Sequence, residues 1–301
     1  MKLFKRFFVV ALAVAMVFSL AACGTVEENG ENGENGENGD PVETVESVEI
    51  GYVEWACATA SSYLVKNIIT EVMGHEATLT ALGAGVMWQS VGTGDIDFFV
   101  CAWLPGTHAD YYSELEGDMV DLGPNYEGAR IGLVVPAYVE IDSIAELADY
   151  ADEFDGKIVG IDAGAGIMAA AADAIDVYGM DLELQESSDA AMTAALSAAI
   201  ADEEWVVVTG WAPHWKFADW DLKFLDDPEG VFGGAETINT ITRLDFADDN
   251  PEIQAFLDNF FMTPEQLGEL IGMMNEYDDN NEAAQAWIDA NMDVVNGWLG
   301  Q

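Results

Sequence analysis

The chain has 301 residues, half of them hydrophobic, and its 56 Asp and Glu face only 9 Lys and Arg, which gives a formal charge of -47 at pH 7. A protein of this charge repels phosphate backbones, so the composition excludes a nucleic-acid partner. The acidic residues are spread along the chain and not gathered in one tail, which is typical of a solvating surface. Our hypothesis is that this spread is an adaptation to high external salt, which screens the repulsion.

Residues 1–22 have the layout of a secretory signal peptide. Basic residues precede an apolar run over 7–20, which is too short to span a membrane comfortably. Small residues then lead into Cys23, as in the lipobox of exported lipoproteins, so we expect Cys23 to carry a lipid anchor. An ordinary cleavage site beside an incidental cysteine is the alternative. The expected location is outside the cytoplasm, on the outer face of the plasma membrane or in a periplasm.

Residues 23–47 are polar and repetitive, with Glu-Asn-Gly triplets that start at Glu31, Glu34 and Glu37. A segment with few apolar residues and no aromatic ones cannot bury enough surface to fold alone. A flexible coil of this length spans about 25 Å. We therefore expect an acidic flexible linker that tethers a folded part beginning at residue 48.

Short apolar strands alternate with helical stretches after the linker. The expected strands are 48–53, 77–82, 97–100, 130–135, 157–161, 182–186, 205–209 and 237–243. The expected helices are 56–73, 85–91, 166–178, 189–201, 252–261, 264–275 and 282–294. This alternation predicts an α/β fold with parallel sheets and helical crossovers.

The order of these elements implies two sheets, and therefore two lobes. If the strand at 237–243 returns to the first sheet, lobe 1 comprises 48–135 and 238–301, and lobe 2 comprises 136–237. Two strands, near Val135 and Ile238, then join the lobes and form a hinged cleft. Ligands of open α/β sheets bind at the carboxyl ends of the strands, so both lobes should present binding residues there.

Three tryptophans, Trp55, Trp103 and Trp211, each directly follow an expected strand. One tryptophan in such a place is more often part of the core than of a site. Three at equivalent strand ends, divided between two lobes, favour a shared binding site.

Four runs around these residues resemble those of glycine-betaine-binding proteins of osmoprotectant ABC importers. The runs are Gly-Tyr-Val-Glu-Trp at 51–55, Ala-Trp-Leu-Pro at 102–105 followed by His108, Asp-Ala-Gly-Ala-Gly-Ile at 162–167, and Gly-Trp-Ala-Pro-His-Trp at 210–215. The resemblance extends from about residue 48 to residue 299. It implies the two-lobed Venus-flytrap fold of type II periplasmic binding proteins, with two crossover strands between the lobes.

The resemblance also implies an aromatic cage, because Trp55, Trp103 and Trp211 match the three rings that surround a trimethylammonium group in that family. A quaternary ammonium has no N–H to donate, so the faces of electron-rich rings are its natural partners.

The resemblance assigns the carboxylate of the ligand to the backbone amides of Gly166 and Ile167 and to the side chain of His108. A glycine-rich turn that opens a helix points free N–H groups and the positive end of the helix dipole at an anion. A helix-start histidine facing solvent is the alternative for His108. His214 is expected behind the cage, where it supports the indole of Trp211 or caps a turn.

The function that the resemblance implies is that of an extracytoplasmic solute-binding lipoprotein. It would capture glycine betaine or a related betaine and deliver it to an ABC permease with its ATPase, as a monomer without cofactor or metal. Choline, carnitine or proline betaine are alternative ligands of the same fold. A more remote alternative is an extracytoplasmic enzyme or a sensory binding protein.

Two other patterns carry alternatives. The turn from Gly164 through Gly166 to Ala169 also fits the dinucleotide fingerprint G-x-G-x-x-A, but an exported protein lacks a supply of that cofactor. No G-x-S-x-G or H-E-x-x-H motif is present, so we expect no catalysis. Cys57 and Cys101 form either a disulfide or two buried free thiols.

Overall fold

The computed structural model describes residues 46–301. The expected signal peptide, Cys23 and all but the last two residues of the expected linker lie outside the described residues. None of the helices in the described part is long and apolar enough to cross a membrane.

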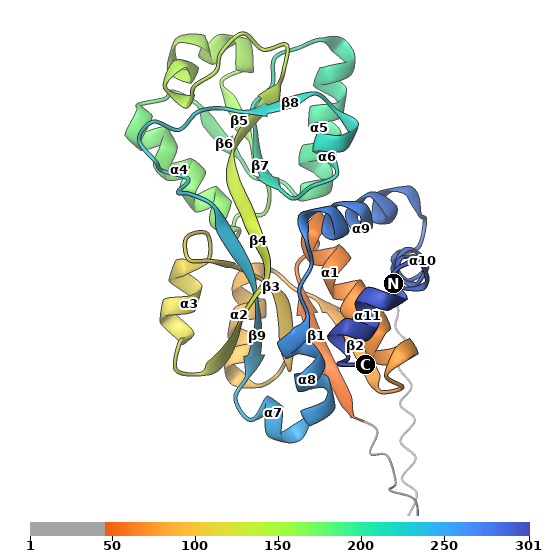
Figure 1. The fold of residues 1–301 in the computed structure, drawn as a ribbon. Helices are drawn as coiled ribbons and strands as arrows, with labels where there is room; N and C mark the ends of the chain where they lie inside the picture. Colours follow the sequence, from red (N-terminus) through yellow and green to blue (C-terminus); the bar gives the residue numbers. More distant parts are fainter. Residues whose placement is uncertain (1–45) are drawn as a thin grey trace, which may run out of the picture. The chain divides into compact units, whose positions relative to one another are not determined.

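Within residues 46–301, nine strands form one sheet in the order β2-β1-β3-β9-β4-β7-β5-β6, and β8 pairs with β4 (Figure 1). The strands are β1 (Ser47–Tyr52), β2 (Glu76–Ala81), β3 (Phe98–Leu104), β4 (Met119–Pro136), β5 (Lys157–Val159), β6 (Glu183–Gln185), β7 (Val208–Ala212), β8 (Leu222–Phe224) and β9 (Glu236–Arg243). Neighbouring strands at the two outer parts of the sheet are parallel, whereas β9 and β4 are antiparallel to their partners.

Strand β4 joins the two parts of this sheet, because it is much longer than the expected strand at 130–135. Its residues from Met119 to Ala129 pair with β9, and those from Arg130 to Pro136 pair with β7 and β8. We call β1, β2, β3, β9 and the first part of β4 the β1 lobe, and β5, β6, β7, β8 and the second part of β4 the β7 lobe. Figure 1 shows β4 running from one lobe into the other. The two expected sheets are thus two parts of one continuous, curled sheet.

The expected helices are found close to their ranges, but the described chain also has helices at 109–115, 144–154, 216–219 and 246–249 that were not expected. The helices are α1 (Ala56–Asn67), continued by a π-helical turn (Ile68–Val72), α2 (Ala84–Thr93), α3 (Ala109–Leu115), a 3-10 helix (Ile144–Phe154), α4 (Gly166–Tyr178), α5 (Asp189–Asp202), α6 (Lys216–Asp219), α7 (Phe246–Asp249), α8 (Pro251–Asn259), α9 (Pro264–Glu276), α10 (Asn280–Ala290) and α11 (Met292–Trp298). The expected helix at 282–294 is wrong in one respect, because the chain breaks at Asn291, which has non-helical dihedral angles, and forms two helices.

The core of the β1 lobe is built around β3, in which every residue from Phe98 to Leu104 is buried. A strand covered on both faces shows a continuous apolar run, as this one does. Helix α1 packs on β1, β2 and β3, and helices α9 and α10 pack on α1. Capping fixes where α9 begins: Thr263 accepts from the backbone of Gln266, whose side chain bonds back to Thr263, and Pro264 opens the first turn. The beginning of α1 at Ala56 places the preceding Trp55 at the edge of the sheet.

The expectation that all three cage tryptophans directly follow a strand is correct only for Trp55, the N-cap residue of α1. Trp103 lies inside β3, opposite Ile238 of β9, and Trp211 lies inside β7, opposite Ile131 of β4. β3 continues beyond the expected strand at 97–100 along its pairing with β9, and β7 lies three residues later than the expected strand at 205–209, paired with β4. The two tryptophans still lie near the carboxyl ends of their strands.

Candidate functional site

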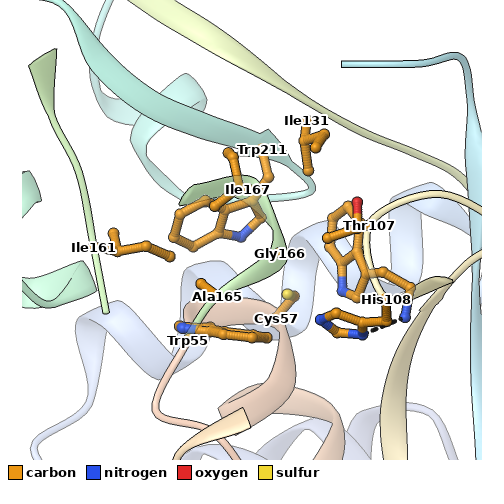
Figure 2. Close-up of a pocket in the computed structure, with 11 residues that line it drawn as sticks. Trp55, Cys57, Thr107, His108, Ile131, Ile161, Ala165, Gly166, Ile167 and Trp211 are labelled. Carbon is orange, nitrogen blue, oxygen red and sulfur yellow. Dashed lines mark hydrogen bonds between the residues drawn. The ribbon is translucent and has the colours of Figure 1, made fainter. Parts of the chain in front are cut away.

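A small pocket lies beside these strand ends and is lined from both lobes (Figure 2). The lining residues are Trp55, Cys57, Trp103, Thr107, His108, Ile131, Ile161, Ala165, Gly166, Ile167 and Trp211. All six residues that the sequence singles out for ligand contact are among them.

The three indole rings are the largest side chains of the pocket, and each is at most 6% exposed. Trp55 donates its Nε1–H to Asp162 Oδ2 at 3.2 Å, so a carboxylate from the β7 lobe holds this ring. A hydrogen bond to a charged acceptor polarises the donor, and here it makes the face of the indole more electron-rich. The Nε1 atoms of Trp103 and Trp211 are buried without a partner in residues 46–301. The rings therefore offer the pocket electron-rich faces.

His108 is the N-cap residue of α3, and its side chain lies in the pocket wall, stacked on Trp55 with ring centroids 5.9 Å apart. Its Nδ1 accepts a hydrogen bond from the backbone N–H of Trp103 at 3.0 Å, so Nδ1 carries no proton. Burial lowers the pKa of His108 to about 3, so the ring is neutral near pH 7. The proton of the neutral ring therefore sits on Nε2, which is buried and has no partner among the described residues. His108 thus presents one fixed N–H donor, and the alternative of a solvent-facing histidine is wrong.

The first residues of α4, Gly166 and Ile167, add backbone donors. Amides in the first turn of a helix have no carbonyl partner within the helix, and no hydrogen bond from either of these amides is found within residues 46–301. A Cβ atom added at Gly166 would overlap the backbone carbonyl of Thr107. Glycine is required here because the loop before α3, from the β1 lobe, lies directly against the start of α4, from the β7 lobe.

Hydrogen bonds between the lobes surround the pocket. Tyr111 Oη donates to the carbonyl of Gly164 at 2.9 Å, and the backbone N–H of Ala56 donates to Asp189 Oδ2 at 3.0 Å. Together with the bond from Trp55 to Asp162, these contacts join segments of both lobes beside the cavity. The structure therefore has the pocket closed between the lobes.

Glu236, the first residue of β9, fixes the loop that carries His108. Its buried carboxylate accepts from the backbone N–H groups of Gly106 at 3.0 Å and Thr107 at 2.9 Å, and from the hydroxyl of Thr107. Charge-assisted hydrogen bonds of this kind are roughly twice as strong as neutral ones. Since β9 begins at Glu236, the start of a strand that runs along β4 sets the position of this wall of the pocket.

His214 does not line the pocket but supports it from behind. Its ring lies edge-on against Trp211, with centroids 4.8 Å apart, and its Nε2 lies 3.0 Å from Asp189 Oδ1. Its Nδ1 accepts from the backbone N–H of Lys216 at 3.1 Å. Burial lowers the pKa of His214, although the hydrogen bond with Asp189 acts in the opposite direction. The neutral ring therefore links Trp211 to the start of α6 and to α5.

Some pocket residues were not found from the sequence. Cys57 was noted only for a disulfide, and it and Cys101 are two buried free thiols in the structure. Thr107 and Ala165 lie inside or beside the runs that carry the resemblance and could have been included on that ground. Ile131 and Ile161 carried no signal, because an isoleucine at a strand end looks like any core residue.

A family model described as the substrate binding domain of ABC-type glycine betaine transport systems matches residues 46–290. The glycine betaine/carnitine transport binding protein GbuC of Listeria monocytogenes is 48% identical over 153 residues, which are 50% of this chain and 51% of GbuC. The chain therefore spans about half the length of this curated relative.

Solved structures give matches over most of the described residues. The lactococcal OpuAC in its closed-liganded conformation with glycine betaine has a TM-score of 0.80 and 37% identity, over 84% of this chain and 99% of that one. A choline-binding protein of an ABC transporter, in complex with choline, has a TM-score of 0.78 and 27% identity, over 84% of this chain and 91% of that one. These relatives are binding proteins of transporters and not enzymes.

Proposed function

Because the chain belongs to the family of substrate-binding domains of ABC-type glycine betaine transport systems, we propose that it captures glycine betaine or a related betaine outside the cytoplasm. It then delivers the solute to an ABC permease and its ATPase. One observation carries the proposal: one pocket contains three indole rings together with N–H groups of His108, Gly166 and Ile167 that have no hydrogen-bond partner among residues 46–301.

Trp55, Trp103 and Trp211 form what we call the aromatic wall, which takes the trimethylammonium group. Each cation–π contact contributes about 1 to 2 kcal/mol when water is excluded. Three such contacts supply a large part of the roughly 8 kcal/mol that corresponds to micromolar binding. The hydrogen bond from Trp55 to Asp162 supports this role because it keeps one ring fixed and polarised.

The Nε2–H of His108 and the backbone N–H groups of Gly166 and Ile167 form what we call the donor wall, which takes the carboxylate. The helix dipole of α4 favours an anion at this place, and the neutral His108 adds a donor that does not require protonation. Because these N–H groups would be costly to bury unpaired, the empty pocket is expected to hold water until a ligand replaces it.

Both walls draw on both lobes, so a ligand is fully enclosed only when the lobes meet. We propose that the lobes, 48–135 with 238–301 and 136–237, close over the ligand by a hinge in the two connecting segments. The bonds of Tyr111 to Gly164 and of Ala56 to Asp189 would form on closure. The closed form is the one that docks on the permease.

The proposal includes export as a monomeric lipoprotein anchored through Cys23 on the outer face of the plasma membrane or in a periplasm. The lipid anchor at Cys23 is inferred from the N-terminal sequence alone. Expression of the full chain with Cys23→Ser in a bacterial host tests it: the wild-type protein should be in the membrane fraction and the variant should be released. Equal partition of the two proteins would contradict the anchor.

Choline and carnitine are the second candidate ligands, because a choline complex and a glycine betaine/carnitine binding protein are among the relatives. The donor wall should distinguish choline from the betaines, because choline has the trimethylammonium group but no carboxylate for this wall.

Titration of the purified protein, followed by tryptophan fluorescence and by calorimetry, tests the proposed function. Glycine betaine should bind with a micromolar Kd and change the emission of the buried indoles. The absence of any response to glycine betaine, proline betaine, carnitine and choline would contradict the substrate class.

A further inference from the structure

Lys216, the first residue of α6, is a fully buried lysine beside the pocket. Its Nζ lies 4.2 Å from the centroid of the Trp211 ring and 5.7 Å from that of Phe217. The side chain is not among the residues that line the pocket, so its ammonium covers the indole of Trp211 from outside the cavity. The same indole is therefore shared by Lys216 and by whatever occupies the pocket.

The Lys216 ammonium has no hydrogen-bond partner in residues 46–301. The charged or titratable groups around it are Asp189 at the start of α5, Cys57 in α1 and His214 on the preceding turn. Asp189 makes no hydrogen bond to it; its Oδ2 accepts from the backbone N–H of Ala56, and its Oδ1 lies 3.0 Å from His214 Nε2. A buried lysine is rare, and this one is stabilised by cation–π attraction to two rings and by the nearby charge of Asp189.

We propose that Lys216 determines the specificity and the pH dependence of the site: its ammonium competes with a cationic ligand for the indole of Trp211. This inference rests on the proposed function. A trimethylammonium group on the pocket side of the ring would lie within about 10 Å of Nζ. Between buried charges at this separation the repulsion is little screened. Lys216 therefore opposes the binding of the cation.

The repulsion acts unequally on the two classes of ligand. Choline carries a net positive charge and meets it in full. In glycine betaine the carboxylate is attracted by the same ammonium, which offsets part of the repulsion. A charged Lys216 therefore favours zwitterions over simple cations, and specificity comes from a repulsive element as well as from the donor wall.

The sign of the pH effect follows from the burial of Lys216. Burial lowers the pKa of this ammonium to about 7, so the group is mostly charged at pH 6 and mostly neutral at pH 8.5. The pKa of His108 is lowered to about 3, so this ring stays neutral over the interval. Burial also lowers the pKa of His214 from the ordinary histidine value. Affinity should therefore rise with pH. By linkage, a bound cation lowers the pKa of Lys216 further and expels its proton.

Calorimetry with wild-type protein, glycine betaine and choline at pH 6 and pH 8.5 tests the inference. We expect betaine to bind at least threefold more tightly at pH 8.5, and choline to gain more than betaine. Near pH 7, titrations in buffers of different ionisation enthalpy should reveal a fraction of a proton released for each ligand bound. Lys216→Met should bind both ligands with little pH dependence, and its choline-to-betaine affinity ratio at pH 6 should rise at least threefold.

Lys223→Met is the matched control, because Lys223 is also in the β7 lobe but pairs with Asp142 near the surface. This variant should keep the wild-type pH dependence and affinity ratio. The inference is wrong if the wild type binds betaine equally at both pH values without proton release, or if Lys216→Met keeps the wild-type pH dependence and ratio. The proton release is measured on the wild type, so it tests the inference about Lys216 even if Lys216→Met does not fold. A wild type that binds neither ligand at either pH would overturn the proposed function, and this inference with it.

Discussion

The aromatic wall and the donor wall of the pocket are built in different ways. The aromatic wall consists of three side chains that sit near the carboxyl ends of β1, β3 and β7. The donor wall consists of two backbone amides and one histidine whose tautomer is fixed by the backbone of Trp103. Rings attract a charge without a hydrogen to donate, whereas N–H groups recognise an acceptor. The two walls should therefore respond separately to changes in the protein and in the ligand.

The largest effect is expected from Gly166→Ala, which breaks both walls at once. The added methyl group overlaps the carbonyl of Thr107, so the lobes cannot approach to the separation seen in the structure. We expect the affinity for glycine betaine, measured by calorimetry, to fall at least about 100-fold, which is about 2.7 kcal/mol.

Gly164→Ala is the matched control on the same turn, because an added Cβ there would meet only the hydroxyl of Tyr111, at an ordinary contact distance of 3.6 Å. This variant should bind glycine betaine within about threefold of the wild type. Small-angle scattering should show compaction on ligand addition for the control and not for Gly166→Ala. Wild-type affinity in Gly166→Ala would contradict the closed arrangement.

Trp103→Ala breaks the aromatic wall alone. Loss of one cation–π contact of about 1 to 2 kcal/mol should weaken the binding of glycine betaine and of choline alike, by about 5- to 30-fold. Trp103→Phe keeps an aromatic face and should lose much less. Parallel fluorescence titrations with both ligands give the comparison. If Trp103→Ala lowered the affinity for only one of the two ligands, the ring would not be binding the trimethylammonium group that they share.

His108→Ala breaks the donor wall alone. Removing the Nε2–H donor should lower the affinity for glycine betaine by about tenfold, because a hydrogen bond to a charged group contributes roughly 1.5 kcal/mol or more. Choline, which has no carboxylate, should change by less than about twofold. His108→Gln retains an N–H donor and is the conservative control. Equal losses for both ligands would show that His108 acts through the packing of Trp55 and not through the carboxylate.

Salt should have the smallest effect on binding. It separates the charge on the surface of the protein from the interactions in the pocket. The charge of -47 lies on a surface that salt screens, whereas the pocket is buried and screened little. Molar potassium chloride should raise the midpoint of thermal unfolding while the betaine-to-choline affinity ratio stays unchanged. Equal thermal stability in dilute buffer and in molar salt would contradict the idea of adaptation to saline surroundings.

Much of the site could be predicted from the sequence because its binding residues lie in short stretches of the chain. The glycine turn before α4 and the tryptophans near strand ends carry local signals, and the structure brings Trp55, Trp103, Trp211, His108, Gly166 and Ile167 to one cavity. The helix at 166–178 is confirmed to the residue, since its start and its C-terminal glycine are both local features.

Features that depend on distant partners could not be predicted. The length of β4 is set by pairing with β9 at one end and β7 at the other, which no local pattern reports. The same holds for Trp211, whose strand pairs with β4 and lies later in the chain than the expected strand. Lys216 shows the limit most clearly: a lysine after Trp215 is expected to face solvent, but the tertiary fold buries it over the ring of Trp211 in β7.

A crystal structure of the protein with glycine betaine tests the central claim most directly. The account predicts the trimethylammonium group between the rings of Trp55, Trp103 and Trp211, with a carboxylate oxygen within hydrogen-bond distance of His108 Nε2 and of the amides of Gly166 and Ile167. Density for the ligand in the reverse orientation, or at another place on the protein, would contradict it.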